Sequence, residues 1–146
     1  MWVAVKTVTA AIIVRDHNVL LTRRGPAEKL AGFWEFPGGK LEDGESPSEC
    51  LRRELLEELG VEADVGEIMA QSEYHYDHGS FLLVGMYACL ASDNLKLTVH
   101  DQAEWVPISA LLTYRLAPAD IPIAVQLQGQ SRQNTLEVEC QQRPHD

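Results

Sequence analysis

Apolar residues alternate with polar ones or gather in short runs over most of this chain, and both patterns are typical of β-strands. Two β-rich runs, Val3 to Val14 and Val19 to Thr22, flank the turn-forming residues 15–18, which predicts a hairpin. The runs Glu62 to Tyr76 and Ser80 to Ala91 predict a second pair of strands. Much of the chain is therefore expected to form sheet.

Two segments predict helices. The clearer one begins after Ser46, because Ser46-Pro47-Ser48-Glu49 supplies an N-cap hydroxyl, a proline at the first helical position and a capping-box glutamate. It is expected to end at Gly60. Pro118 opens a second helix over about 119–128, and residues 105–112 predict a strand that leads into a short helix. Strands alternating with two helices predict an α/β domain with a mixed sheet.

The segment Gly25 to Gly44 is rich in glycine and proline and predicts a long functional loop. The polar residues 129–146 predict a tail outside a domain of residues 1–128. Within that tail, the alternation from Thr135 to Cys140 fits an edge strand, and disorder fits it equally well.

The chain has 146 residues and carries a net charge of −10, with 12 basic against 22 acidic side chains. Such a balance disfavours binding to nucleic acid polymers, which depends on basic side chains. It does not exclude small phosphorylated ligands, because a metal ion can bridge carboxylates and phosphates.

Three cysteines without a C-x-x-C pair suggest neither a disulfide framework nor a zinc knuckle, and a reducing cytoplasm fits best. No signal peptide is indicated, and the longest apolar run, Phe81 to Ala91, is too short for a membrane helix. The chain is therefore expected to be cytoplasmic without a membrane partner, as a monomer or a homodimer.

Three glutamates share one side of the predicted helix. At about 100° per residue, Glu54, Glu57 and Glu58 fall within about 100° of one another, beside a stripe of leucines. Like charges at this spacing oppose helix formation. A solvated helix face would explain them, and so would a site for Mg²⁺ or Mn²⁺, which prefer oxygen ligands.

The residues around the helix separate these alternatives. Five residues lie between Gly39 and Glu45 and seven between Glu45 and Arg53, after which the chain continues as Glu54-Leu55-Leu56-Glu57-Glu58-Leu59-Gly60-Val61. This resembles the Nudix hydrolase signature G-x5-E-x7-R-E-U-x-E-E-x-G-U, where U is aliphatic, at every specified position. The chain is therefore similar to Nudix hydrolases.

The resemblance implies an α/β/α sandwich, a small-molecule nucleotide substrate and metal-assisted attack of water on phosphorus. It implies that divalent metal is held by Gly39, through its carbonyl, and by Glu54, Glu57, Glu58 and Glu104. Glu45 and Arg53 would stabilise the loop and helix, and Arg53 would also orient a ligating glutamate. Glu57 and Glu104 are the candidates for the general base, although Glu104 also fits an ordinary loop charge.

Three flanking stretches, residues 22–24, 34–40 and 116–122, resemble the MutT-like branch, which includes pyrophosphohydrolases of CTP and of oxidised dNTPs. The resemblance implies that five residues bind the substrate. They are Arg24, Glu35, Phe36, Tyr76 and Asp120, where Asp120 would hydrogen-bond the base edge and Tyr76 would stack on the base.

Alternatives stay open at two of these positions, since Asp120 also suits the first turn of a helix and Phe36 also suits a core. MutT proteins selective for 8-oxoguanine usually carry Asn where this chain has Asp120. An ionised Asp only accepts hydrogen bonds, so it favours an exocyclic amino group, such as that of cytosine.

Other chemistry-bearing side chains receive plainer interpretations. His75, His78 and His100 lack metal-ligand spacing and are expected at the surface or in substrate loops, and Cys50 is expected to pack as a small helix residue. The favoured function is a nucleoside triphosphate pyrophosphohydrolase. The alternatives are a hydrolase of ADP-ribose, nucleotide sugars or dinucleoside polyphosphates, and a non-catalytic ligand-binding domain.

Overall fold

The computed structural model describes residues 6–133. Its strands are β1 (Lys6–Ile12), β2 (Val14–Arg15), β3 (Asn18–Arg24), β4 (Trp34–Glu35), β5 (Ala63–Tyr76), β6 (Gly79–Leu90) and β7 (His100–Pro107). Its helices are α1 (Pro47–Leu59), α2 (Ile121–Gln133) and two short 3-10 helices, η1 (Ile108–Thr113) and η2 (Pro118–Asp120). The elements that carry the candidate site are α1, β3, β4, β7 and η2.

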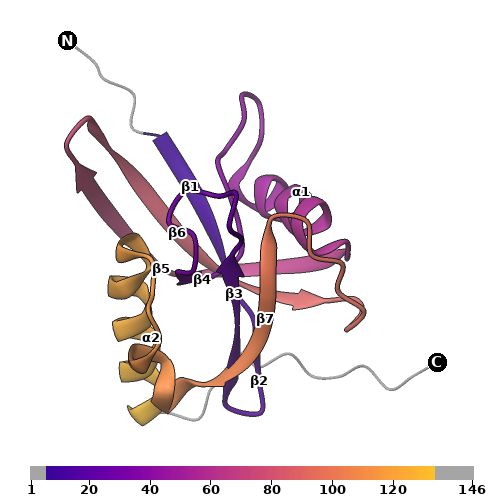
Figure 1. Cartoon of the computed structure of the whole chain (residues 1–146), viewed down its shortest axis with the longest axis vertical. Helices are drawn as coiled ribbons and strands as arrows, with labels where there is room; N and C mark the ends of the chain where they lie inside the picture. The colour runs from indigo at the N-terminus through magenta and orange to yellow at the C-terminus, as the bar shows by residue number, and fades with distance from the viewer. Residues whose placement is uncertain (1–5, 134–146) are drawn as a thin grey trace.

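The strands form two sheets. In the first, β1 runs parallel to β6 and β6 pairs antiparallel with β5, so this sheet is mixed. In the second, β3 pairs antiparallel with β2, β4 and β7. Figure 1 shows the long β5–β6 hairpin extending away from β3 and β7.

The predicted N-terminal hairpin is only partly correct. It exists as β2 and β3, joined at Asp16 and His17, whose positive φ angles of 51° and 64° suit a two-residue hairpin turn. β1 instead pairs with β6, so the apolar run changes sheets at Ile13. The sequence of this run does not indicate the change, because no turn-forming residue interrupts it. Residues 3–5 lie outside the described part of the chain.

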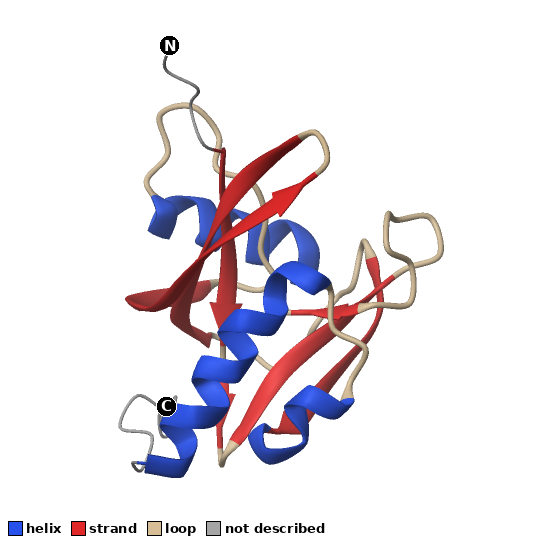
Figure 2. Ribbon diagram, turned by 90° about the vertical axis from the view of Figure 1, so that its left-hand side faces the viewer, coloured by secondary structure: helices blue, strands red, loops and turns tan. Residues whose placement is uncertain are grey.

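Successive residues of β1 and the segment after it supply two cores, since neighbouring side chains on a strand point to opposite faces. Ala10 and Ile12 pack in the core that α2 covers, whereas Ala11 and Ile13 pack in the core that α1 covers. Figures 1 and 2 show the two helices on opposite sides of the strands. The predicted α/β/α sandwich with a mixed sheet is confirmed.

Helix α1 begins and ends where the sequence predicts. The Ser46 hydroxyl accepts a hydrogen bond from the Glu49 N–H at 3.2 Å, and the Glu49 carboxylate accepts one from the Ser46 N–H at 2.9 Å. Gly60 ends the helix in the left-handed conformation at φ 69°. Because Leu51, Leu55 and Leu59 are buried along one stripe, the rotation of the acidic side is fixed.

Three boundaries differ from the prediction. β7 begins at His100 and not at Trp105, and Pro118 opens the short 3-10 helix η2, after which α2 begins at Ile121. α2 continues to Gln133, beyond the predicted domain boundary at residue 128. The predicted edge strand at 135–140 lies outside the described residues, and within 6–133 no helix is long and apolar enough to cross a membrane.

The capping box gives a test of local stability. We expect Ser46→Ala to lower the free energy of unfolding by about 1 kcal/mol, because the Glu49 N–H loses its acceptor. Ser48→Ala, two residues further along and inside the first turn of α1, is the matched control. It should change stability by less than about 0.5 kcal/mol. Urea denaturation followed by circular dichroism measures both, and equal effects would contradict the capping role.

Candidate active site

Arg53 ties the loop before α1 to the acidic side of the helix. Its guanidinium donates to both carboxylate oxygens of Glu45, at 2.6 and 2.9 Å, and to the Lys40 carbonyl at 3.1 Å. It also donates to Glu54 at 3.0 Å and to Glu57 at 3.2 Å. The hydrogen bonds from Arg53 lower the pKa of Glu45 to about 2, so this carboxylate stays ionised. The predicted contacts of Arg53 with Glu45 and Glu54 are present.

Gly38 and Gly39 form the narrow floor beside α1. A Cβ atom on Gly38 would clash with the Thr9 carbonyl, and one on Gly39 would clash with the Glu54 carboxyl. The Gly39 carbonyl oxygen accepts hydrogen bonds from the Thr9 N–H at 2.8 Å, the Thr9 hydroxyl at 3.1 Å and the Cys50 thiol at 3.6 Å. Its hydrogen-bond donors come from β1 and from Cys50, and its role as a metal ligand stays a prediction. The absence of a side chain at Gly39 leaves the space that Glu54 occupies.

Cys50 fills the interior between β1 and α1, as expected of a packing residue. Its side chain is fully buried, and this burial raises the pKa of the thiol. A buried thiol whose pKa is raised is a poor nucleophile. Cys50 therefore supports the loop and takes no part in chemistry.

Glu58 and Glu54 form a strained carboxylate pair. Burial, followed by the charges of Glu54 and Glu35, raises the pKa of Glu58 to about 9. The Oε1 atom of Glu58 is buried and has no hydrogen-bond partner within the described residues. A divalent cation would satisfy this oxygen and remove the repulsion, so the donor set fits such an ion.

Glu57 stands apart from this pair. Its side chain is 58% exposed and is turned toward the Arg53 guanidinium. In agreement, no group of three Asp, Glu, His or Cys side chains in residues 6–133 already surrounds a common metal position. The structure thus brings together Glu54 and Glu58 and leaves Glu57 at the solvent side of the same helix.

Glu104 is positioned by β7 and by one hydrogen bond. It sits on β7 opposite Leu21 of β3, and Leu21 belongs to the core on the α2 side. Its carboxylate accepts a hydrogen bond from the Tyr114 hydroxyl at 3.0 Å, which raises the pKa of that phenol. The roles of Glu104 as a metal ligand or general base stay predictions.

A second polar group lies where β3, β4 and β7 meet. The Glu35 carboxylate accepts hydrogen bonds from the Arg24 guanidinium at 2.8 Å and from Nε2 of His100 at 2.8 Å. Arg24 also donates from Nε to the Lys29 carbonyl in the loop before β4. The structure thus joins two predicted substrate residues, Arg24 and Glu35, to His100, to which the sequence analysis gave no specific role.

Asp120 lies on η2 and is buried, with 6% of its surface exposed. Its Oδ2 accepts a hydrogen bond from the Phe36 N–H at 2.8 Å. Burial, with a contribution from the charge of Glu35, raises the pKa of Asp120 to about 8. This shift favours the protonated carboxyl near neutral pH, whereas the sequence analysis considered the ionised form.

The two predicted aromatic residues occupy different environments. Phe36 is buried in the core on the α2 side, so its packing role is the one that the structure supports. Tyr76 is 44% exposed at the end of β5, where its ring packs with Tyr74 and Phe81. Only Tyr76 keeps a ring surface accessible to a ligand.

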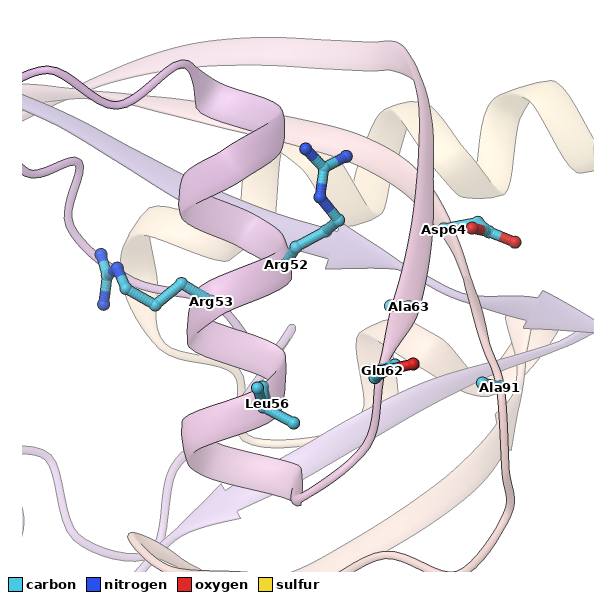
Figure 3. Close-up of a pocket in the computed structure, with 7 residues that line it drawn as sticks. All are labelled: Arg52, Arg53, Leu56, Glu62, Ala63, Asp64 and Ala91. Atoms are coloured by element: carbon cyan, nitrogen blue, oxygen red, sulfur yellow. The ribbon is translucent and has the colours of Figure 1, made fainter.

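A hollow of about 460 Å³ lies on another side of α1, and Figure 3 shows it between this helix and the start of β5. It is lined by Arg52, Arg53, Leu56, Glu62, Ala63, Asp64 and Ala91. Arg52 and Arg53 leave the helix in different directions (Figure 3). The Glu54–Glu58 pair does not line this hollow.

His100 and Thr9 are the site residues that sequence reasoning missed. His100 was expected at the surface or in a substrate loop, but its side chain is 1% exposed. It follows a loop and shows no apolar periodicity, so nothing in the local sequence signalled burial. Thr9 occupies an apolar strand position, where a polar side chain facing a glycine-rich turn was the available signal.

Comparison with known proteins gives a consistent family relationship. The profile of the NUDIX domain matches residues 5–127. The CTP pyrophosphohydrolase of Escherichia coli is 43% identical over 119 residues, covering 80% of this chain and 86% of that protein. A putative 8-oxo-dGTP diphosphatase 2 of Mycobacterium tuberculosis is 51% identical over 116 residues, covering 77% and 81%.

Solved structures agree with this relationship. The solution structure of the E. coli ORF135 protein superposes with a TM-score of 0.75 at 38% identity, covering 86% of this chain and 89% of that one. The MutT protein from Methanosarcina mazei gives a TM-score of 0.75 at 25% identity, covering 88% and 96%. The match therefore extends over nearly the whole described fold and includes α1.

The carboxylate pair predicts a conflict between stability and metal binding. We expect Glu58→Gln to stabilise the metal-free protein by about 1–3 kcal/mol at pH 7, because the variant has no proton to take up on folding. Since the pKa of Glu58 is raised in the folded state, the wild type loses stability as the pH rises from about 4.5 to about 9. The gain should therefore grow with pH.

Urea denaturation in the presence of a chelator, at pH 5 and at pH 8, measures this effect. Glu67→Gln, at an exposed position on β5, is the matched control and should show no such trend. A Glu58→Gln protein that is less stable than the wild type at pH 8 would contradict the raised pKa of Glu58 in the folded protein.

Proposed function

Because this chain belongs to the NUDIX domain family, we propose that it is a Mg²⁺-dependent nucleoside triphosphate pyrophosphohydrolase, which releases a nucleoside monophosphate and pyrophosphate. The carrying observation is the pair Glu54 and Glu58, which stands beside Arg53 and leaves one buried oxygen without a partner. Every acidic residue of the signature is retained, which favours a catalytic domain over one that only binds a ligand.

In this proposal Glu54 and Glu58 hold the metal, and Arg53 keeps Glu54 oriented toward it. When bound, a divalent ion supplies positive charge that offsets the charge developing on the phosphate oxygens. Glu57 is the candidate to take the proton from the attacking water, since it is exposed and lies on the same helix. Glu104, hydrogen-bonded to Tyr114, is the weaker candidate for this role.

The substrate class follows from the buried group around Asp120. An un-ionised carboxyl both donates and accepts hydrogen bonds. It therefore matches a base edge that presents a donor beside an acceptor, as cytosine does with its N4 amino group and N3. The edge of 8-oxoguanine formed by N7–H and O6 has the same arrangement, whereas unmodified guanine presents two acceptors there. Cytidine and oxidised guanine nucleotides are therefore the proposed substrates.

Two relatives support this choice, since one is named for CTP and another for 8-oxo-dGTP. Arg24 stands near Asp120, as its charge acts to lower the pKa of that carboxyl. A guanidinium at this place suits contact with a nucleotide. Tyr76 supplies an accessible ring for stacking.

Pyrophosphate release tests the reaction class. With Mg²⁺, the panel contains CTP, dCTP, 5-methyl-dCTP, dGTP, 8-oxo-dGTP, ADP-ribose and a nucleotide sugar. The last two yield two phosphomonoesters and no pyrophosphate, so their cleavage is followed through those phosphomonoester products. We expect turnover of the cytidine and 8-oxoguanine triphosphates, and a loss of at least about 100-fold in Glu54→Gln and Glu58→Gln, beyond that typical of outer partners of metal ligands. Glu67→Gln is the matched control and should retain activity.

Other outcomes would redirect the assignment. Cleavage of ADP-ribose or the sugar alone would favour a hydrolase of other diphosphates and would remove the base-recognition role of Asp120. If no compound were turned over, a ligand-binding domain would be the better description.

The protonated state of Asp120 predicts a pH dependence. As the pH rises through about 8, Asp120 loses its proton and its ability to donate. We therefore expect kcat/KM for CTP and 8-oxo-dGTP to fall relative to Asp120→Asn, whose amide donates at every pH. The ratio of wild type to variant isolates Asp120, because both proteins share the metal site. A ratio independent of pH from 6 to about 9 would exclude this mode of recognition.

A further inference from the structure

His100 is held firmly where three parts of the fold meet. It pairs with Arg24 at the start of β7, and the preceding Val99 carbonyl accepts a hydrogen bond from the Gly25 N–H at 3.0 Å. Two residues earlier, Thr98 donates from its N–H to the Glu58 carbonyl at 3.3 Å and from its hydroxyl to the Glu57 carbonyl at 3.1 Å. The segment Thr98–His100 thus joins the last turn of α1 to the end of β3.

The His100 ring uses this fixed position to hold one partner. Nε2 lies 2.8 Å from Oε2 of Glu35, and because a carboxylate accepts, Nε2 is the donor. Nδ1 is buried and has no hydrogen-bond partner within residues 6–133. Within residues 6–133, the bond to Glu35 is therefore the only hydrogen bond of this ring.

Glu35 in turn has each carboxylate oxygen assigned to a different partner, Oε1 to Arg24 and Oε2 to His100. A carboxylate held at both oxygens cannot rotate without breaking a charge-assisted hydrogen bond. Without His100, only the Arg24 bond would remain, and Arg24 is a flexible side chain that also contacts the Lys29 carbonyl. His100 therefore decides the orientation of the carboxylate between these partners.

We propose that His100 is a positioning residue, which fixes Glu35 and through it Arg24 in the orientation that binds the nucleotide. This inference rests on the proposed function, because it assigns the Arg24–Glu35 pair to the nucleotide site. Glu35 is well placed for the role, since its charge acts on both Glu58 and Asp120. His100 acts on the substrate only through Glu35.

Steady-state kinetics with CTP and Mg²⁺, in a double-mutant cycle, test the proposal. His100→Met replaces the imidazole with an apolar side chain of similar length and removes the donor. We expect KM to rise about tenfold with a much smaller change in kcat, as for loss of a charge-assisted hydrogen bond that positions a binding group. His100→Gln, whose amide can donate to Glu35, should recover most of the loss.

The cycle separates action through Glu35 from a general loss of structure. In the Glu35→Gln background, His100→Met should add less than about twofold to KM, because the partner is already altered. A separate tenfold effect in that background would overturn the proposal. So would an unchanged KM in His100→Met, or a fall in kcat and melting temperature with KM unaffected.

Two further results complete the test. If His100→Met does not fold, His100→Gln and Glu35→Gln still decide: the first must retain the wild-type KM and the second must raise it, and the reverse pattern would overturn the proposal. If the wild type turns over no nucleoside triphosphate, the proposed function itself has failed. Binding of CTP to the wild type, measured by calorimetry, distinguishes that failure from a failure of the His100 role.

Discussion

The guanidinium of Arg53 donates in several directions at once, to Glu45 and Lys40 in the loop and to Glu54 and Glu57 on the helix. Its rigid fork sets directions as well as distances, which the single point charge of a lysine would not do. Because these groups are partly exposed, the bonds contribute little to stability through charge alone. Their consequence is geometric, since the loop and the helix cannot move independently.

Around this anchor, negative charge is concentrated to an extent that folding alone would not favour. Burial, with a contribution from the charge of Glu35, raises the pKa of both Glu58 and Asp120. The two sites resolve the repulsion differently. In the proposed function, a cation would replace the proton at Glu58, whereas the proton would stay at Asp120 and supply a hydrogen-bond donor. Under that proposal, similar burial would suit one carboxyl to a metal and the other to a base.

The sequence was sufficient for α1, because its capping box, its C-terminal glycine and its leucine stripe are all local signals. It was insufficient at Ile13, where an unbroken apolar run passes from one sheet to the other, and at His100, whose burial depends on β3 and β4. The signature identified Arg53 and its partners, but it could not show which way the Gly39 carbonyl faces. That direction is set by Thr9, thirty positions away along the chain.

The loop between Gly39 and α1 is fastened at both ends, by β1 at Gly39 and by Arg53 at Lys40 and Glu45. An added or deleted residue would shift Glu45 away from the guanidinium or push the backbone into Glu54. The number of residues in this loop is therefore fixed by its contacts at both ends. Related enzymes that acquire new specificities would have to vary elsewhere, for example in the segment 25–33, where Leu30 is exposed.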